Sequence, residues 1–245
     1  MSLRAVILAG GLGNRMKSDI PKVLHPICGR PIIEYIIKAT TLATSAKPWI
    51  VYSPVSKILK TTFSEVADFA LQDEPRGTGH AFRSALDVMP ADVDEIILTV
   101  GDAPLIRAET LTALIKKHHE NSAPITMTAL ELKDPTGYGR LITDKDGSVL
   151  KIVEEKDATA EEKSVIKVNA GLYAFDANWA RQAVKQLIPS PVTNEYYVTD
   201  LVAIARNQGK TVNLFELQDP TDLHGINTPE QLARAEEIMR KQTAP

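Results

Sequence analysis

Short runs of apolar residues alternate along the chain with longer segments in which apolar residues recur every three or four positions. The runs are rich in Val and Ile and have the length of buried β-strands. They predict strands over Arg4–Ala9, Pro48–Ser53, Ile96–Val100, Ile125–Leu132, Leu150–Val153, Leu172–Phe175 and Val212–Leu217. Because strands that alternate with helices are typical of α/β proteins, we expect a mixed, mostly parallel, Rossmann-like sheet flanked by helices.

Helices are predicted where the longer segments place apolar residues on one face, around 81–89 and around 111–118. The start of the last helix carries residues typical of a helix cap. Thr228 suits the cap position, and Gln231 stands three residues later, where its side chain returns the capping hydrogen bond. This arrangement places Asn227 directly before a well-defined helix.

The pattern changes after about Asp134. Pro135–Gly139 are turn-forming residues, and Asp144–Gly147 is typical of the connection in a β-hairpin. The sequence has no Ser/Gly-rich linker between the two parts. We therefore expect one domain over residues 1–245 with two lobes, a mostly parallel core over 1–133 and a small mixed β region over 134–245.

The composition is that of a globular protein. Its 245 residues are 44% hydrophobic and 24% charged, which suits one large α/β domain or two small ones. Lys and Arg number 28 against 31 Asp and Glu, for a net charge of −3. Since the charges nearly cancel, we expect neither nucleic acid nor a membrane as a partner, and any phosphate recognition must be local.

The single cysteine, Cys28, excludes an intrachain disulfide, and we expect it to be a half-buried residue rather than a nucleophile. A secretory pattern and a long apolar span are both missing from the sequence, so we expect a cytoplasmic protein. His118 and His119, at the end of a predicted helix, are expected at the surface. Zinc-ligand spacing is absent among the remaining histidines, His25, His80 and His224.

A glycine-rich segment, Gly10–Gly13, follows the first predicted strand. Glycines there let backbone N–H groups approach phosphate oxygens, and Arg15 and Lys22 provide positive charge nearby. Met16 stands where a dinucleotide-binding fingerprint has its third glycine, and the Gly-Lys-Ser/Thr ending of a P-loop is missing. This loop alone leaves two interpretations open, a phosphate cradle and a tight turn with solvated charges.

The segment Leu8–Met16, followed by Pro21–Leu24 and Gly29–Ile32, resembles the entry motif of sugar-1-phosphate nucleotidyltransferases. The closest resemblance is to uridylyltransferase domains that form UDP-N-acetylglucosamine. Further matches follow in the same order along the chain, in Gln72…Gly77–Ala81, Gly101–Leu105, Gly137–Arg140, Ile152–Thr159, Asn169–Gly171, Glu195–Asp200 and Gly225–Asn227. The resemblance implies Mg²⁺-dependent transfer of a uridylyl group from UTP to N-acetylglucosamine 1-phosphate, with release of pyrophosphate.

Asp102 follows the predicted strand Ile96–Val100, so its carboxylate is expected at the carboxyl end of the sheet, where open α/β folds bind ligands. An oxygen ligand there suits Mg²⁺, although an aspartate that caps the helix before Ala108 is an equally simple interpretation. The resemblance assigns Asp102 and Asn227 to the metal, and Arg15, Lys22 and Asp102 to catalysis. A sugar phosphate is already ionised near neutral pH, so the reaction needs no strong general base.

The resemblance also assigns substrate contacts to each lobe. It implies nucleotide binding by Leu8, Ala9, Gly10, Gly11, Gly13, Gln72, Gly77, Thr78 and Gly101. It implies sugar binding by Gly139, Glu154, Asn169, Tyr197 and Thr199. Simpler interpretations stay open for Gln72 as an exposed loop residue, for Glu154 as part of a solvated charge run, and for Tyr197 as part of an apolar stripe that starts a helix.

Gly11, Asn14 and Ala170 depart from the residues common in the closest uridylyltransferases. They leave open a related transferase that uses dTTP or another sugar 1-phosphate. A catalytically silent nucleotide-sugar-binding protein is a separate alternative, which the joint presence of Arg15, Lys22, Asp102 and Asn227 disfavours. A dinucleotide-dependent oxidoreductase is disfavoured by Met16. We expect small-molecule partners, with a homo-oligomer left open, and no β-helical acetyltransferase domain before the sequence ends at Pro245.

Overall fold

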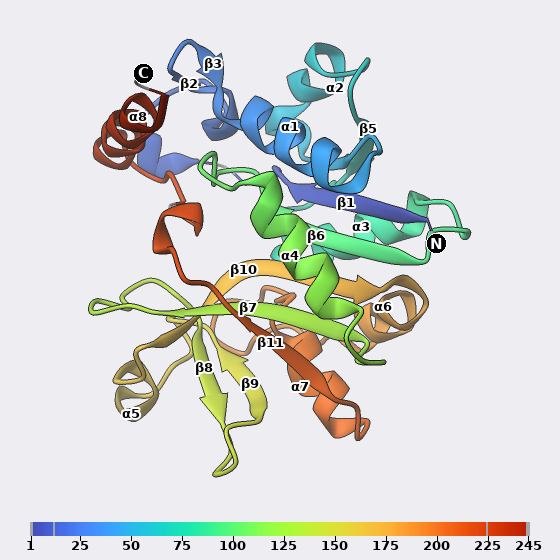
Figure 1. Cartoon of the computed structure of the whole chain (residues 1–245). Coiled ribbons are helices and arrows are strands. Elements are labelled where there is room, and N and C mark those ends of the chain that lie inside the picture. The colour runs from blue at the N-terminus through green and yellow to red at the C-terminus, as the bar shows by residue number, and fades with distance from the viewer. Residues whose placement is uncertain (1, 12, 224, 244–245) are drawn as a thin grey trace.

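The computed structural model describes residues 2–11, 13–223 and 225–243, so Leu12 of the glycine-rich segment, His224 and Pro245 lie outside the described residues. It is an α/β protein with a mostly parallel central sheet flanked by helices, as predicted (Figure 1). The strands are β1 Leu3–Leu8, β2 Pro26–Ile27, β3 Arg30–Pro31, β4 Trp49–Tyr52, β5 Asp68–Leu71, β6 Glu95–Val100, β7 Ile125–Glu131, β8 Arg140–Thr143, β9 Val149–Val153, β10 Lys167–Asp176 and β11 Val212–Glu216. The helices are α1 Ile32–Thr44, α2 Ile58–Thr62, α3 Thr78–Val88, α4 Ala108–His118, α5 Ala160–Lys163, α6 Ala177–Ala183, α7 Asp200–Asn207 and α8 Pro229–Thr243.

The main sheet has the strand order β11-β7-β10-β6-β1-β4-β5. Neighbours from β6 to β5 are parallel, as are β11 and β7, whereas β10 runs antiparallel to both β6 and β7. The β8–β9 hairpin joins this sheet where Arg140 pairs with Val168 of β10. The pairing of β6 with β10 makes one sheet continuous across the expected boundary at residue 133.

Helices cover both faces of the sheet. α1 and α4 contact each other and pack on one face, whereas α3, α6 and α7 lie on the other. Side chains of β1 alternate accordingly, because Ala5 and Ile7 belong to the core under α1 and Val6 belongs to the core under α3. Burial on both faces explains why β1 is a nearly continuous apolar run, and it leaves the carboxyl ends of the parallel strands to form a site.

The cap of the last helix and the hairpin turn that the sequence predicts are both present. Gln231 N donates to Thr228 Oγ1 at 3.3 Å, and Thr228 N donates to Gln231 Oε1 at 3.2 Å, which completes the cap of α8. Between β8 and β9, Gly147 N donates to Asp144 O at 3.1 Å and adopts a φ of 79°. Both features confirm the sequence predictions.

Two expectations about exposure are wrong. His118 is only 6% exposed, and its Nδ1 lies 2.8 Å from Thr126 Oγ1, because its helical position turns it toward the sheet. Cys28 is exposed rather than half-buried, since Cys28 and Gly29, with φ values of 47° and 81°, form the tight turn between β2 and β3. None of the helices in the described ranges is long and apolar enough to cross a bilayer.

Candidate active site

The glycine-rich segment leaves β1 at the carboxyl ends of the parallel strands and packs closely on its neighbours. A Cβ added to Gly10 would lie 2.9 Å from Gln72 Oε1, and one added to Gly13 would lie 2.9 Å from Lys22 Cβ. Gly13 also has a φ of 65°, which favours glycine. Gly101 touches the start of this loop, since its N–H donates to Leu8 O at 2.8 Å. These glycines are therefore required by close packing.

Four polar side chains meet beside this loop although they are far apart in the sequence. Lys22 Nζ forms an ion pair with Asp102 and donates to Asn227 Oδ1 at 2.8 Å. Arg15 donates to the same Asn227 oxygen at 2.9 Å. The backbone joins the segments that carry Asp102 and Asn227, because Ile226 N donates to Asp102 O at 2.8 Å. The structure thus brings together Arg15, Lys22, Asp102 and Asn227, which we call the polar cluster.

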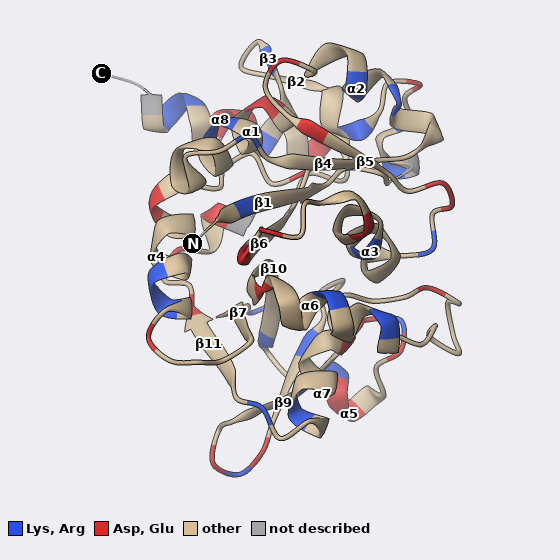
Figure 2. Ribbon diagram, turned by 90° about the vertical axis from the view of Figure 1, so that its right-hand side faces the viewer, with Lys and Arg blue, Asp and Glu red and all other residues tan. Residues whose placement is uncertain are grey.

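Lys22 and Asp102 are partly buried, with side chains 14% and 18% exposed, so their attraction is screened less than that of a surface pair. Asp102 does not cap α4, whose cap position is held by Arg107. Basic and acidic segments are scattered over both halves of the molecule, as Figure 2 shows. The positive charge of Arg15 and Lys22 is therefore a local feature of the polar cluster.

A cavity of about 360 Å³ opens between the glycine-rich loop and the start of α3. Its walls include most of the residues predicted to bind nucleotide, namely Leu8, Ala9, Gly10, Gly11, Gln72, Gly77 and Thr78, together with Lys22 and Asp102. Gly13 and Gly101 support the loop from behind rather than line this cavity. We call this space the nucleotide-side cavity.

Gln72 is buried at 4% exposure, which excludes its interpretation as an exposed loop residue. Its Nε2 donates to Gly77 O at 3.0 Å, which fixes the orientation of the carboxamide. Gly77 has a φ of 96°, and a Cβ there would lie 2.5 Å from Tyr196 O. The adjoining Thr78 accepts a hydrogen bond from Val198 N at 3.0 Å. These contacts attach the segment before α7 to the wall of the nucleotide-side cavity.

Four of the five residues predicted to bind sugar lie together around Glu154. Thr199 Oγ1 donates to Glu154 Oε1 at 2.8 Å, and a Cβ added to Gly139 would lie 3.4 Å from Glu154 Oε2. Gly139 O accepts from Asn169 N at 2.8 Å, beside the point where the register of β10 shifts. The structure thus groups Gly139, Glu154, Asn169 and Thr199, which we call the Glu154 group.

Burial raises the pKa of Glu154, a rise that the hydrogen bond from Thr199 opposes and the nearby Asp200 increases. Glu154 is consequently a positioned acceptor rather than one of a run of solvated charges. Tyr197 lies before α7 and its hydroxyl is 2.5 Å from Thr193 Oγ1. Tyr197 and Glu154 line a second cavity of about 550 Å³, whose lining does not include Gly139, Asn169 or Thr199.

Three residues of this region, Glu195, Arg140 and Glu155, were not predicted as site residues from the sequence. Glu195 lines the nucleotide-side cavity. Arg140 is almost fully buried and forms an ion pair with Glu155 at 2.7 Å. Arg140 ends the Gly137–Arg140 match, and Glu155 is the second of two successive glutamates. Both residues were therefore within matched segments, but a charged residue gives no sequence signal of burial.

Known proteins that are similar to this chain indicate its family. Residues 4–221 match the family model described as nucleotidyl transferase. The bifunctional protein GlmU of Pelotomaculum thermopropionicum is 41% identical over 241 residues, which cover 98% of this chain and 53% of that protein. The bifunctional protein GlmU of Thermoanaerobacter pseudethanolicus is 40% identical over 239 residues, or 98% of this chain and 52% of that protein. The chain spans about half the length of these curated relatives. With the family model matched over most of its length, the chain belongs to the nucleotidyl transferase family.

Proposed function

We propose that this chain transfers a uridylyl group from UTP to N-acetylglucosamine 1-phosphate, with Mg²⁺ as cofactor. An oxygen of the sugar phosphate forms a bond to the α-phosphorus of UTP. The bond from that phosphorus to the oxygen that bridges the α- and β-phosphates breaks, and pyrophosphate leaves with that oxygen. The products are UDP-N-acetylglucosamine and pyrophosphate. The resemblance in the sequence supports this proposal, as do the relatives named as bifunctional GlmU proteins.

The observation that carries the proposal is the position of the polar cluster. It borders the nucleotide-side cavity, and Lys22 and Asp102 belong to both. Two anionic substrates repel each other, so the catalyst must align them and balance charge at the transferring phosphoryl group. Arg15 and Lys22 supply positive charge at that position. The sugar phosphate is itself the nucleophile, so no triad is required.

The donor set of the polar cluster fits Mg²⁺. Asp102 and Asn227 present oxygen atoms, and these oxygens already hold a cation of the chain itself, the Lys22 ammonium group. Among the residues that the structure describes, no three His, Cys, Asp or Glu side chains gather as a metal cluster. A site with so few protein ligands suits an ion that shares its shell with phosphate and water. Bound there, Mg²⁺ would supply positive charge to the phosphate oxygens.

The two groups of predicted contacts give each substrate its own place. Gln72 and the backbone around Gly77 offer donors and acceptors for the uracil edge, an edge that thymine shares. Glu154 offers a carboxylate to sugar hydroxyls, and Asn169 offers an amide. Discrimination against dTTP and against other sugar phosphates therefore belongs to the proposal and needs a direct test.

We test the proposal by measuring pyrophosphate release with UTP or dTTP, each paired with N-acetylglucosamine 1-phosphate or glucose 1-phosphate, with and without Mg²⁺. Release is expected to be fastest with UTP, N-acetylglucosamine 1-phosphate and Mg²⁺ together. Asp102→Asn should lower kcat by about 100-fold or more with a native circular dichroism spectrum. The matched control is Asp92→Asn, at an exposed turn residue.

Preference for another substrate pair would overturn the choice of base or sugar and leave the transferase class. Binding of UDP-N-acetylglucosamine with no pyrophosphate release from any pair would instead indicate a catalytically silent binding protein. The proposal also includes a cytoplasmic location, where UTP is made, and small-molecule rather than nucleic-acid partners. It treats residues 1–133 as the nucleotide lobe and residues 134–245 as the sugar lobe of one domain.

A further inference from the structure

Arg140, the first residue of β8, is a buried cation that the proposed chemistry does not use. Its side chain is 2% exposed, and a buried guanidinium group must be paired and hydrogen-bonded. It forms an ion pair with Glu155 at 2.7 Å and donates to the backbone oxygen of Tyr138. It also donates to Lys163 O at 3.4 Å. Its partners therefore come from the turn before β8, the loop after β9 and the end of α5.

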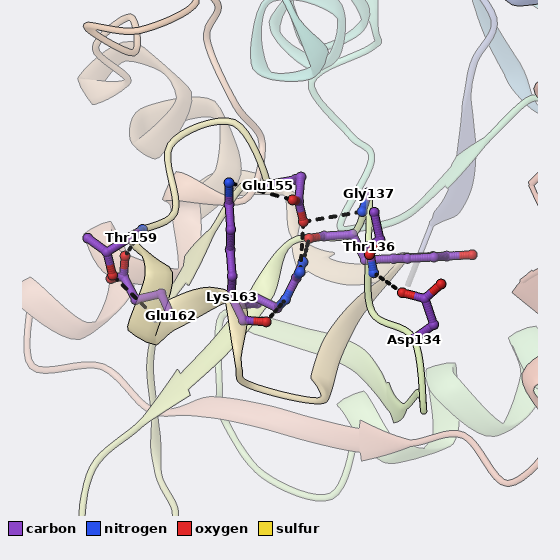
Figure 3. A network of polar contacts seen from close by, with 9 residues as sticks. Asp134, Thr136, Gly137, Glu155, Thr159, Glu162 and Lys163 are labelled. Atoms are coloured by element: carbon purple, nitrogen blue, oxygen red, sulfur yellow. Dashed lines mark hydrogen bonds and ion pairs between the residues drawn. The ribbon is translucent and has the colours of Figure 1, made fainter.

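Glu155 closes the same network from the other side. Its Oε2 accepts from Gly137 N at 3.2 Å, and its Oε1 lies 3.8 Å from Lys163 Nζ. Figure 3 shows the Glu155 carboxylate with Gly137 on one side and Lys163 on the other. The hydrogen bond from Arg140, followed by the one from Gly137, lowers the pKa of Glu155, so the ionised form is the one that the network holds.

The residues of this network are adjacent in sequence to two proposed sugar contacts, Gly139 and Glu154. Tyr138 O, the acceptor for Arg140, belongs to the peptide unit that continues into Gly139. Glu155 directly follows Glu154. Gly139 packs closely on Glu154, since a Cβ added to Gly139 would lie 3.4 Å from Glu154 Oε2. The ion pair thus fixes the backbone of the turn against the backbone that carries Glu154.

We propose that the buried Arg140 and its partly exposed partner Glu155 are a positioning device for the sugar 1-phosphate, and that they hold the turn at residues 137–139 against Glu154 before the substrate arrives. This inference rests on the proposed function. A purely structural role would instead lower stability and affect both substrates alike. We assign neither residue to catalysis, since both act through the turn that they hold.

Glu155→Gln is the primary test, because it keeps the size and an acceptor for Gly137 N while it removes the charge that pairs with Arg140. We expect the KM for N-acetylglucosamine 1-phosphate to rise about tenfold, with the KM for UTP changed less than about twofold. Arg140→Lys should have the same signature, since an ammonium group cannot replace the forked contacts. The matched control is Lys151→Met, which removes the 3.0 Å ion pair between Lys151 of β9 and Glu162 of α5.

Equal changes in both KM values, or a lower melting temperature with no change in either KM, would overturn the positioning role. Glu155→Gln keeps the test decisive if Arg140→Lys fails to fold. Hydrogen exchange of amides 137–139 gives a readout independent of turnover, and it should accelerate in Glu155→Gln but not in Lys151→Met. If the unmodified chain releases no pyrophosphate from any substrate pair, the proposed function fails. The exchange data then decide the positioning role alone, and unchanged protection would reject it.

Discussion

Replacing Asp200 with asparagine should stabilise the protein at high pH and have little effect at low pH. Asp200 begins α7, and burial, followed by the charge of Asp157, raises its pKa from 3.8 to about 6. Since 1 pKa unit corresponds to about 1.4 kcal/mol, this difference gives an upper value of about 3 kcal/mol. Partial exposure reduces that value, and the loss of a negative charge at a helix start removes about 0.3–1 kcal/mol. We therefore expect Asp200→Asn to add about 1–2 kcal/mol at pH 8.

The sign follows from proton binding. Between pH 3.8 and about 6 the folded protein holds the Asp200 proton while the unfolded chain has lost it, so stability falls as the pH rises through this window. The asparagine variant has no proton to lose there. Its advantage should be complete above about pH 7 and shrink to about a fifth at pH 4.

Thermal and urea unfolding at pH 4 and pH 8 measure this difference. For a protein of this size, about 1–2 kcal/mol corresponds to a melting temperature about 3–6 °C higher at pH 8. Asp92→Asn, at an exposed turn, should change stability equally little at both pH values. The same gain for Asp200→Asn at both pH values, or a loss at pH 8, would refute the reasoning.

Other changes test the two substrate regions. Lys22→Met should lower kcat for pyrophosphate release by about 100-fold at saturating substrates, because it removes a preorganised cation; an unchanged kcat would exclude that role. Gly77→Ala should lower the free energy of unfolding by about 2–3 kcal/mol in urea, since a φ of 96° and a 2.5 Å approach to Tyr196 O both oppose a side chain. Thr199→Val removes a donor from Glu154, so it should raise the pKa of that carboxyl further. The midpoint in the pH profile of the sugar-phosphate KM should move upward, and an unmoved midpoint would contradict this assignment.

Strand positions could be predicted from the sequence because buried strands need apolar residues on both faces. The predicted strands coincide with β1, β4, β6, β7, β9, β10 and β11 to within a few residues, although β10 is longer than its apolar segment. The strand β5 begins with the polar Asp68, and its short edge position gives little apolar signal. The direction of β10 and its place between β6 and β7 depend on long-range pairing, which periodicity does not encode.

The helix α1 shows the opposite case, in which a signal was present but not used. Ile32, Ile33, Ile36 and Ile37 have the spacing of a buried helical face and are at most 5% exposed. Only the first residue of this segment, Ile32, was used, as the end of the Gly29–Ile32 match, and the helix was not predicted. For His118, polarity suggested the surface while helical spacing suggested the core. The spacing decided the outcome, because the Thr126 hydroxyl, 2.8 Å from Nδ1, is a hydrogen-bond partner for the buried ring.

The candidate site could be anticipated only where a resemblance joined distant residues. Asp102 and Asn227 share the Lys22 ammonium group, yet nothing local in either segment predicts that contact. Burial of Arg140 was equally hidden, because it depends on Glu155 and on backbone oxygens supplied by other segments. Such contacts are properties of the assembled sheet, not of sequence windows.

Hydrogen bonds of the segment before α7 keep a fixed spacing between the two proposed substrate regions. Gly79 N donates to Tyr196 O at 2.7 Å and Val198 N donates to the Thr78 hydroxyl at 3.0 Å, so the segment before α7 is attached to α3 through its main chain. The next residue, Thr199, donates to Glu154 at 2.8 Å. A few residues therefore connect the wall of the nucleotide-side cavity to the Glu154 group. Two of these three links use main-chain atoms of the segment, and the third uses the buried Thr199 side chain. The spacing therefore depends on the backbone of this segment and on Thr199 more than on its exposed side chains, in a region with little apolar periodicity of its own.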